Sequence, residues 1–292
     1  MTTTAASDAE RGPLFKIWLS WPLLAGFLVL AVPTAVTLGQ QVWSQEAGAH
    51  GPIVLATGAW LLWRNADEWR RDAAPGAGWI TALALLASFP LYVFGRAYDF
   101  IVLEVAGLYG VGLAMLHALF GLRAMLKNWF PLLYLAFLIP PPGWFIDSIT
   151  APLKLFVSYV ATAGLQLAGI PVFREGVTLS VAQYQLLVED ACSGMNSITG
   201  LIAITLFYIY LLRNASWKYS LLLVFLVVPI AVVANIIRVA TLVLLTYFFG
   251  DAVAQGFLHT AAGMLLFTSA LLLVFLVDNG LSYFLPRKEK AT

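Results

Sequence analysis

The sequence predicts an all-α polytopic membrane protein with about eight transmembrane helices. Its 292 residues are 61% hydrophobic and 11% charged, with a mean hydropathy of +0.87. Soluble domains are about 45–50% apolar and about 25% charged, so a water-soluble globule is excluded. The apolar runs are continuous rather than alternating, which excludes a transmembrane barrel. A net charge of +1 gives no electrostatic basis for binding nucleic acid.

Eight apolar stretches approach the length of about 20 residues that a helix needs to cross a bilayer. The second is short, and the seventh is long enough to tilt or to kink at Pro229. The eight stretches lie at 17–38, 50–63, 78–95, 99–120, 129–146, 193–212, 219–248 and 258–280.

The distribution of basic residues predicts the orientation in the membrane. With the N-terminus in the cytoplasm, only Arg96, Lys154, Arg174 and Arg238 of the 16 basic residues fall outside or within the membrane. The positive-inside rule therefore favours both termini in the cytoplasm. The expected organisation is a cytoplasmic tail at 1–16, transmembrane helices at 17–146, an extracytoplasmic or interfacial segment at 147–192, further transmembrane helices at 193–280 and a basic cytoplasmic tail at 281–292.

The segment 147–192 is neither a clear span nor a short loop. The prolines at 140–142 end the preceding stretch on the outer side, because they cannot continue a helix. Residues 151–170 are apolar enough to span, but a full span there would put Cys192 inside. We therefore expect a re-entrant or interfacial helix, followed by a weak hairpin-like alternation around residues 181–183.

The single cysteine, Cys192, lies at the entrance to the sixth apolar stretch. One cysteine excludes an internal disulfide and a cysteine-based zinc cluster. A helix N-terminus stabilises a thiolate, whereas the preceding Glu189 and Asp190 oppose it, so a reactive thiol needs a nearby cation. A buried small hydrophobe is the alternative role. The polar Ser193 and Asn196 on the first turn favour a functional site, since no packing reason for them is evident.

Arg238 lies inside the otherwise apolar seventh stretch, with Asn235 and Thr241 three residues away on the same face. A guanidinium at membrane depth costs at least about 2.5–3.5 kcal/mol on insertion scales, so it normally faces a polar interior. The alternatives are snorkelling to the outer headgroups or a buried ion pair with Glu189, Asp190 or Asp251.

The three histidines separate by position. His117 falls at the inner end of the fourth stretch, where a structural role is expected, whereas His50 and His259 lie at outer ends. His259 begins the stretch that follows Arg238, and short connections make sequential helices neighbours. A Cys–His pair with an adjacent arginine is the minimum equipment for cysteine-based peptide acyl transfer. The histidines are dispersed and no glycine-rich phosphate loop is present, so we expect neither a metal nor a cofactor.

These residues carry a resemblance to a known family. Residues 191–197, 235–239 and His259, taken in order, resemble the Cys–Arg–His signature of the exosortases, and 173–176 and 188–190 resemble the stretch that precedes its cysteine. The resemblance covers about 170–265. A histidine in third position is similar to the bacterial rather than the archaeal branch.

The resemblance implies a polytopic cysteine enzyme of the inner membrane. It would cleave C-terminal sorting signals of the PEP-CTERM type on the outer side, with transfer to an acceptor nucleophile and a link to exopolysaccharide production. Its partners would be membrane-anchored proteins whose signal contains a proline motif, a transmembrane helix and a basic tail. By the same resemblance Cys192 would be the nucleophile, Arg238 the electrostatic partner and His259 the proton-transfer residue.

A transporter or glycan-export component is the competing hypothesis. In that class Arg238 would bind an anionic substrate, and the presence of Pro229 in the same stretch would also suit the role.

Overall fold

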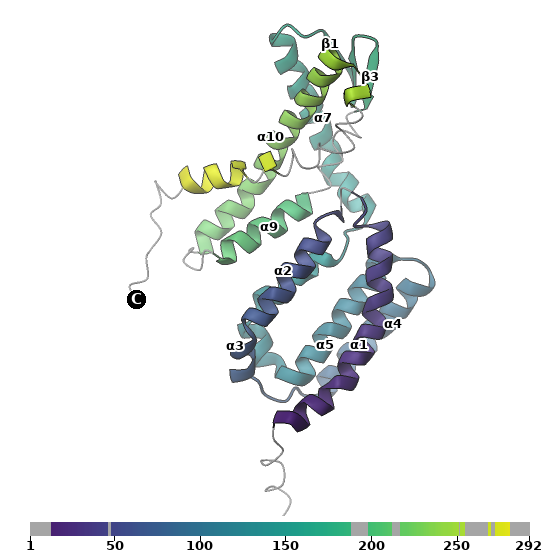
Figure 1. The fold of residues 1–292 in the computed structure, drawn as a ribbon, viewed down its shortest axis with the longest axis vertical. Coiled ribbons are helices and arrows are strands. Elements are labelled where there is room, and N and C mark those ends of the chain that lie inside the picture. The colour runs from purple at the N-terminus through teal and green to yellow at the C-terminus, as the bar shows by residue number, and fades with distance from the viewer. Residues whose placement is uncertain are drawn as a thin grey trace, which may run out of the picture. The chain divides into compact units, whose positions relative to one another are not determined.

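The computed structural model describes residues 13–45, 48–187, 198–211, 217–250, 252–254, 268–269 and 272–280. The chain forms two compact units (Figure 1). Unit 1 consists of residues 1–41 and 59–140, and unit 2 of residues 42–58 and 141–292.

Unit 1 is built from helices in its described part. Acids in the first turn of its short helix α3 and arginines in the last turn complement the helix dipole. The helices are α1 (Pro13–Gln41), α3 (Ala66–Arg71), α4 (Gly78–Ala97), α5 (Ile101–Lys127), α6 (Trp129–Leu135) and the 3-10 turn η2 (Ala136–Leu138), while α2 (Gly51–Arg64) belongs partly to each unit.

Helices α4 and α5 pack closely because glycines remove side chains from their interface. A Cβ on Gly95 would collide with the backbone of Glu104, and a Cβ on Gly107 would collide with that of Tyr92. Small residues at such positions let the backbones of membrane helices approach each other. The pairing of these residues shows that the two helices are antiparallel.

A buried polar network ties α1 to this pair. Glu104 is only 2% exposed and accepts hydrogen bonds at Oε1 from Thr34 (2.7 Å) and from Arg96 (3.0 Å). Arg96 also donates to the hydroxyl of Thr37 at 2.9 Å. Burying a carboxylate is costly unless it is paired and hydrogen-bonded, so these contacts explain how Glu104 is tolerated.

Unit 2 combines helices with a small sheet. Its elements are α7 (Gly143–Leu167), β1 (Val172–Glu175), β2 (Thr178–Val181), β3 (Tyr184–Leu187), α9 (Ile198–Leu211), α10 (Trp217–Phe249) and a helical segment at 272–280. The strands form an antiparallel sheet in the order β1-β2-β3. Ala182, with φ of +50°, makes the turn between β2 and β3.

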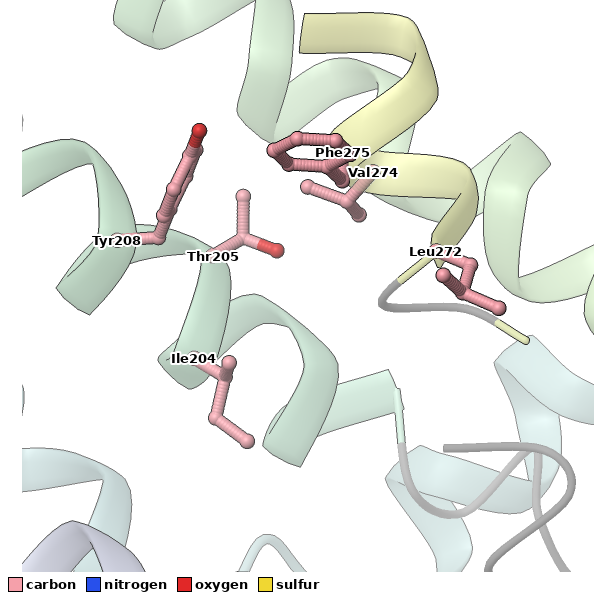
Figure 2. A pocket seen from close by; sticks show the side chains of 6 residues that line it. All are labelled: Ile204, Thr205, Tyr208, Leu272, Val274 and Phe275. Carbon is pink, nitrogen blue, oxygen red and sulfur yellow. The ribbon is translucent and has the colours of Figure 1, made fainter. Parts of the chain in front are cut away.

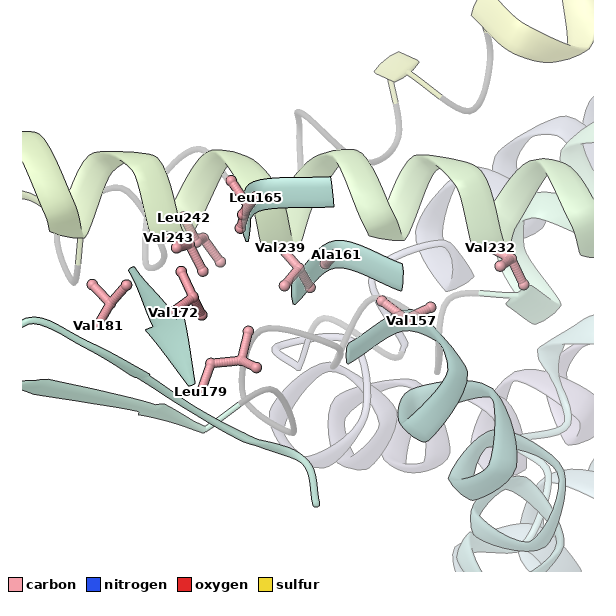
Figure 3. Close-up of a cluster of buried hydrophobic side chains, with 10 residues drawn as sticks. All are labelled: Val157, Ala161, Leu165, Val172, Leu179, Val181, Val232, Val239, Leu242 and Val243. Carbon is pink, nitrogen blue, oxygen red and sulfur yellow. The ribbon is translucent and has the colours of Figure 1, made fainter. Parts of the chain in front are cut away.

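The core of unit 2 lies between α7, α10 and the sheet. In Figure 3 residues 157–165 of α7 run alongside residues 232–243 of α10 in the same order, so the two helices are parallel. The side chains that form this core are Val157, Ala161, Leu165, Val172, Leu179, Val181, Val232, Val239, Leu242 and Val243.

Five helices in the described part of the chain are long and apolar enough to cross a membrane. They are Trp21–Gln41, Gly78–Ala97, Ile101–Lys127, Gly143–Leu167 and Leu221–Phe249, and four of them match predicted stretches. The predicted stretches at 50–63 and 193–212 are the shorter α2 and α9, each of 14 residues in its described part. The last stretch is described only at 268–269 and 272–280.

Two expectations need correction, and the extent of a third element is revised. The fold is mostly helical rather than all-α, because 172–187 forms the three-stranded sheet, of which only the hairpin around 181–183 was predicted. The stretch 129–146 is not one helix, since the prolines at 140–142 separate η2 from α7. The helix expected at 151–170 is part of the continuous 25-residue α7, which is long and apolar enough to cross a membrane, and its re-entrant or interfacial placement stays a prediction.

Candidate active site

Arg238 is the largest fully buried side chain in the described part of the chain. It is 0% exposed, and Asn235, one helical turn before it, is also 0% exposed. In sequence they are flanked by Ala234 and Val239, which are buried in the two hydrophobic clusters that α10 forms within unit 2. The sequence prediction of a buried guanidinium in this helix is confirmed, and snorkelling to a headgroup is wrong for this residue.

Helix α10 is continuous from Trp217 to Phe249, and Pro229 lies within it. At a rise of 1.5 Å per residue, Arg238 lies about 17 Å from the end of the helix at Phe249. The guanidinium is therefore held deep along a regular helix rather than at its terminus.

The neighbouring helix α7 presents a polar stripe that sequence reasoning missed. Thr150, Lys154, Ser158 and Thr162 recur every fourth residue, and all four are buried. Ser158 donates hydrogen bonds to the carbonyl oxygens of Leu155 (2.9 Å) and, in the β1–β2 turn, Gly176 (3.2 Å). Lys154, which is 8% exposed, is a second buried cation in unit 2. The spacing of four residues was the available signal, because residues i and i+4 share one face of a helix.

The other predicted site residues lie in two segments that the structure does not describe. Strand β3 starts beside the end of α10, where a Cβ on Gly250 would lie 3.7 Å from the Tyr184 hydroxyl. The described chain stops at Leu187 on one side and at Ala254 on the other. The remaining predicted site residues, Glu189, Asp190, Cys192, Ser193, Asn196 and His259, lie outside the described residues.

The two other histidines have defined surroundings. His117 is 5% exposed, and its Nδ1 lies 2.9 Å from the Thr81 hydroxyl, as expected for a structural residue. His50 packs against the start of α9, where a Cβ on Gly200 would lie 2.8 Å from the Cβ of His50. Sequence reasoning placed His50 only at the end of a span and missed this contact, which joins residues 150 positions apart.

Within the described ranges, no three His, Cys, Asp or Glu side chains gather closely enough to hold a metal ion. The described part of the site offers the buried guanidinium of Arg238, with the buried amide of Asn235 one turn before it on α10. Such a group stabilises negative charge that develops beside it.

Comparison with known families gives a match to the transmembrane exosortases (Exosortase_EpsH) over residues 42–276. The chain belongs to this family. The match contains Arg238 and extends from α2 to the helical segment 272–280, well beyond the 170–265 on which the resemblance rested. Exosortases are membrane proteases/transpeptidases, and membership implies processing of PEP-CTERM sorting signals in the membrane. Neither the curated proteins nor the solved structures contain a match to this exosortase.

Proposed function

We propose that this exosortase is a membrane-embedded cysteine protease/transpeptidase that cleaves PEP-CTERM-type sorting signals on the outer side of the inner membrane. The observation that carries the proposal is the complete burial of Arg238 within the region that matches the family. Intramembrane arginines normally have a function, because their insertion is costly.

The proposed reaction assigns one step to each of three residues. The Cys192 thiolate adds to the scissile carbonyl, and Arg238 stabilises the oxyanion of the tetrahedral intermediate. His259 gives a proton to the leaving amine as the C–N bond breaks, which leaves an acyl-enzyme. An acceptor amine or water then takes the acyl group and regenerates the thiol. Glu189 or Asp190 orients His259 or pairs with Arg238 in this proposal, and Ser193, Asn196 and Asn235 support the site.

Chain connectivity supports this assignment. Cys192 is five residues after Leu187, and His259 is five residues after Ala254. Five residues span at most about 18 Å, and Arg238 lies about 17 Å below the end of α10. Strand β3 begins beside the end of α10, and Ala254 follows that end by five residues, so segments of this length are compatible with an approach of Cys192 and His259 to the guanidinium.

The parallel course of α7 and α10 supports an active site on the outer side, with a different set of membrane-crossing helices from the one predicted. If α10 leads outward from the cytoplasm, α7 does the same, and the prolines at 140–142 lie on the cytoplasmic side. Helix α7 then crosses the membrane, whereas the segment 129–138 begins and ends on the cytoplasmic side. This arrangement keeps both termini in the cytoplasm and Cys192 outside, with the same number of crossings.

Cysteine labelling tests this orientation. In a Cys192→Ala background, a cysteine at Gly169 should react with a membrane-impermeant maleimide added outside intact cells, and one at Gly143 should not. The opposite labelling pattern would overturn the orientation.

The transporter hypothesis receives no support from α10. Transporter sites are typically formed by discontinuous helices whose ends face the substrate. Helix α10 is continuous from Trp217 to Phe249 with Pro229 inside it, so it is not a discontinuous helix of that kind.

A reporter with a C-terminal proline motif, a transmembrane helix and a basic tail tests the proposed function. Cys192→Ala should abolish its cleavage, and Arg238→Ala should slow cleavage about 10²–10³-fold, the usual effect of removing an oxyanion donor. Arg123→Ala serves as the matched control, because Arg123 is exposed. Cleavage at the unmutated rate by the Cys192→Ala protein would refute the proposal.

A further inference from the structure

The small sheet of unit 2 indicates where the membrane surface crosses this unit. Within the described residues, β1 and β3 are the edge strands, and residues 173–175 of β1 are exposed. Open sheet edges do not occur in contact with lipid hydrocarbon, because their N–H and C=O groups would find no partners there. The sheet therefore lies beyond the hydrocarbon core.

The turn between β1 and β2 is the part of the sheet that reaches furthest back along α7. Gln166 donates a hydrogen bond to the carbonyl oxygen of Val172 at 2.8 Å, and Ser158, two turns earlier, donates to that of Gly176 at 3.2 Å. Strand β1 thus runs back along α7 from the level of Gln166 to the level of Ser158. The hydrocarbon core ends near Ser158 on this helix.

On α10 the same level lies near Asn235, since Figure 3 shows Val157 between Val232 and Val239 along the helix. Residues 217–235 rise about 27 Å, close to the thickness of a hydrocarbon core, about 30 Å. The part of α10 that precedes this level is therefore long enough to cross the membrane.

The other helices of unit 2 pack on the part of α10 that precedes this level. Leu201 near the start of α9 packs with residues 227–234 of α10, and Ile209 packs with Leu223, so α9 leads away from the sheet. A cavity of about 320 Å³ lies between α9 and the helical segment 272–280, and Figure 2 shows its mostly apolar lining. An apolar interior of this kind suits a segment that hydrocarbon surrounds.

The exposed face of α7 carries an interfacial residue at the same level. Phe145, Ile149, Phe156 and Tyr159 are exposed and follow one another at spacings of four, seven and three, so they share one helix face. Residues 143–159 rise about 24 Å. Tyrosine is enriched at membrane–water interfaces, where its ring meets the acyl chains and its hydroxyl meets the headgroups.

Arg174 of β1 is held over this tyrosine. Its guanidinium carbon lies 5.7 Å from the centre of the Tyr159 ring, and its Nη1 donates a hydrogen bond to the carbonyl oxygen of Gly176 at 3.0 Å. The side chain is exposed, and within the described ranges it takes part in no ion pair. A guanidinium has five N–H donors in a fork that matches phosphate, so donors remain for an anion.

We propose that Arg174 and Tyr159 bind the phosphate headgroup of a phospholipid in the leaflet next to the sheet, which is the outer leaflet in the orientation proposed above. A lipid is the occupant because the two side chains continue the lipid-facing side of α7 and because their charge complements a phosphate. The contact holds the sheet on the membrane surface. Arg238 follows Asn235 by one turn and its side chain leans back toward the start of the helix, so its guanidinium is held inside the protein at the edge of the hydrocarbon.

Lipid cross-linking tests this site in the full-length protein. The protein is placed in nanodiscs of phosphatidylcholine and phosphatidylglycerol, with a photoreactive group on the phosphatidylglycerol headgroup. The probe should cross-link to residues 155–163 or 172–176, and Arg174→Gln should lower this yield about fivefold, the usual contribution of one basic residue near an anionic membrane surface. Glu175→Gln, at the exposed neighbour, is the matched control and should not lower it. Equal yields from the Arg174→Gln and unmutated proteins would overturn the proposal.

Two further variants separate lipid binding from support of the turn. Arg174→Lys keeps the charge, and Tyr159→Phe keeps the ring under the guanidinium, so both should retain most of the yield. Hydrogen exchange in residues 172–181 reports whether the turn has loosened. If Arg174→Gln and Arg174→Lys lower the yield equally and both speed this exchange, Arg174 only supports the turn and the proposal is wrong.

Spin labels measure the level of the membrane surface without changing Arg174. In a Cys192→Ala background, a label at position 156 should be more accessible to oxygen, and one at the exposed position 185 more accessible to a water-soluble nickel complex. The reverse at either position would place the surface elsewhere and overturn the proposal. None of these measurements involves cleavage, so their failure leaves the protease proposal standing, and an uncleaved reporter leaves the lipid site standing.

Discussion

Replacing Glu104 tests whether the polar network holds α1 against the α4–α5 pair. Glu104→Ala removes the contacts with Thr34 at 2.7 Å and with Arg96 at 3.0 Å. Interhelical hydrogen bonds in membrane proteins average about 0.6 kcal/mol, with a maximum near 1.7. The expected loss of unfolding free energy is therefore about 1–3 kcal/mol.

The cost stays in this range because Arg96 does not become a buried orphan. Its side chain is 43% exposed and keeps the hydroxyl of Thr37 at 2.9 Å. The loss of about 3–5 kcal/mol that follows when a fully buried charge loses its partner therefore does not apply. Glu104→Gln retains an acceptor oxygen and should cost about 1 kcal/mol.

Unfolding of the detergent-solubilised protein by titrated denaturing surfactant measures these differences. Glu68→Ala is the matched control, since Glu68 lies on an exposed face of the same unit. The reasoning is wrong if Glu104→Ala is as stable as the control, or if it prevents folding altogether.

Three changes in unit 2 have equally specific expectations. Gly200→Ala should lower the free energy of unfolding by about 1–3 kcal/mol, because the added methyl group overpacks against His50. Gly164→Ala, which has open space around it, should be neutral or slightly stabilising in the same unfolding assay. Equal effects of the two changes would contradict the contact between Gly200 and His50. Ala182→Gly should stabilise the protein by up to about 1 kcal/mol, because a left-handed backbone strains any residue with a Cβ; a lower melting temperature would contradict this. Ser158→Ala should speed hydrogen exchange in residues 172–181, since it removes a bond to the β1–β2 turn; unchanged exchange there would show that the bond does not hold the turn.

Continuous apolar runs predicted most of the long helices, because a run of that length has no alternative that satisfies its backbone inside a bilayer. The alternation around residues 181–183 predicted a hairpin for a similar local reason. The sequence also predicted that Arg238 is buried, since the cost of an intramembrane charge can be estimated without knowing its neighbours.

Other features depend on contacts that no local pattern encodes. The start of α7 at Gly143 was missed because residues 143–146 were counted with the preceding apolar stretch, and the polar residues at 147–150 interrupt the apolar run. The pairing of Glu104 with Thr34 and the contact of His50 with Gly200 join residues far apart in the sequence. The burial of Lys154 was not predicted either, because it depends on which face of α7 the rest of unit 2 covers.

The complete burial of Arg238 also limits which negatively charged groups its guanidinium can stabilise. Salt in the surrounding water screens a buried charge poorly, so activity that depends on this guanidinium should vary little with ionic strength. An anion that arrives from solution must lose its hydration before it reaches Arg238, and that loss offsets much of the attraction. A neutral carbonyl pays no such penalty, and its oxygen becomes charged only once it is beside the guanidinium. In the proposed mechanism the arginine thus stabilises charge that forms beside it and not charge that is delivered from water.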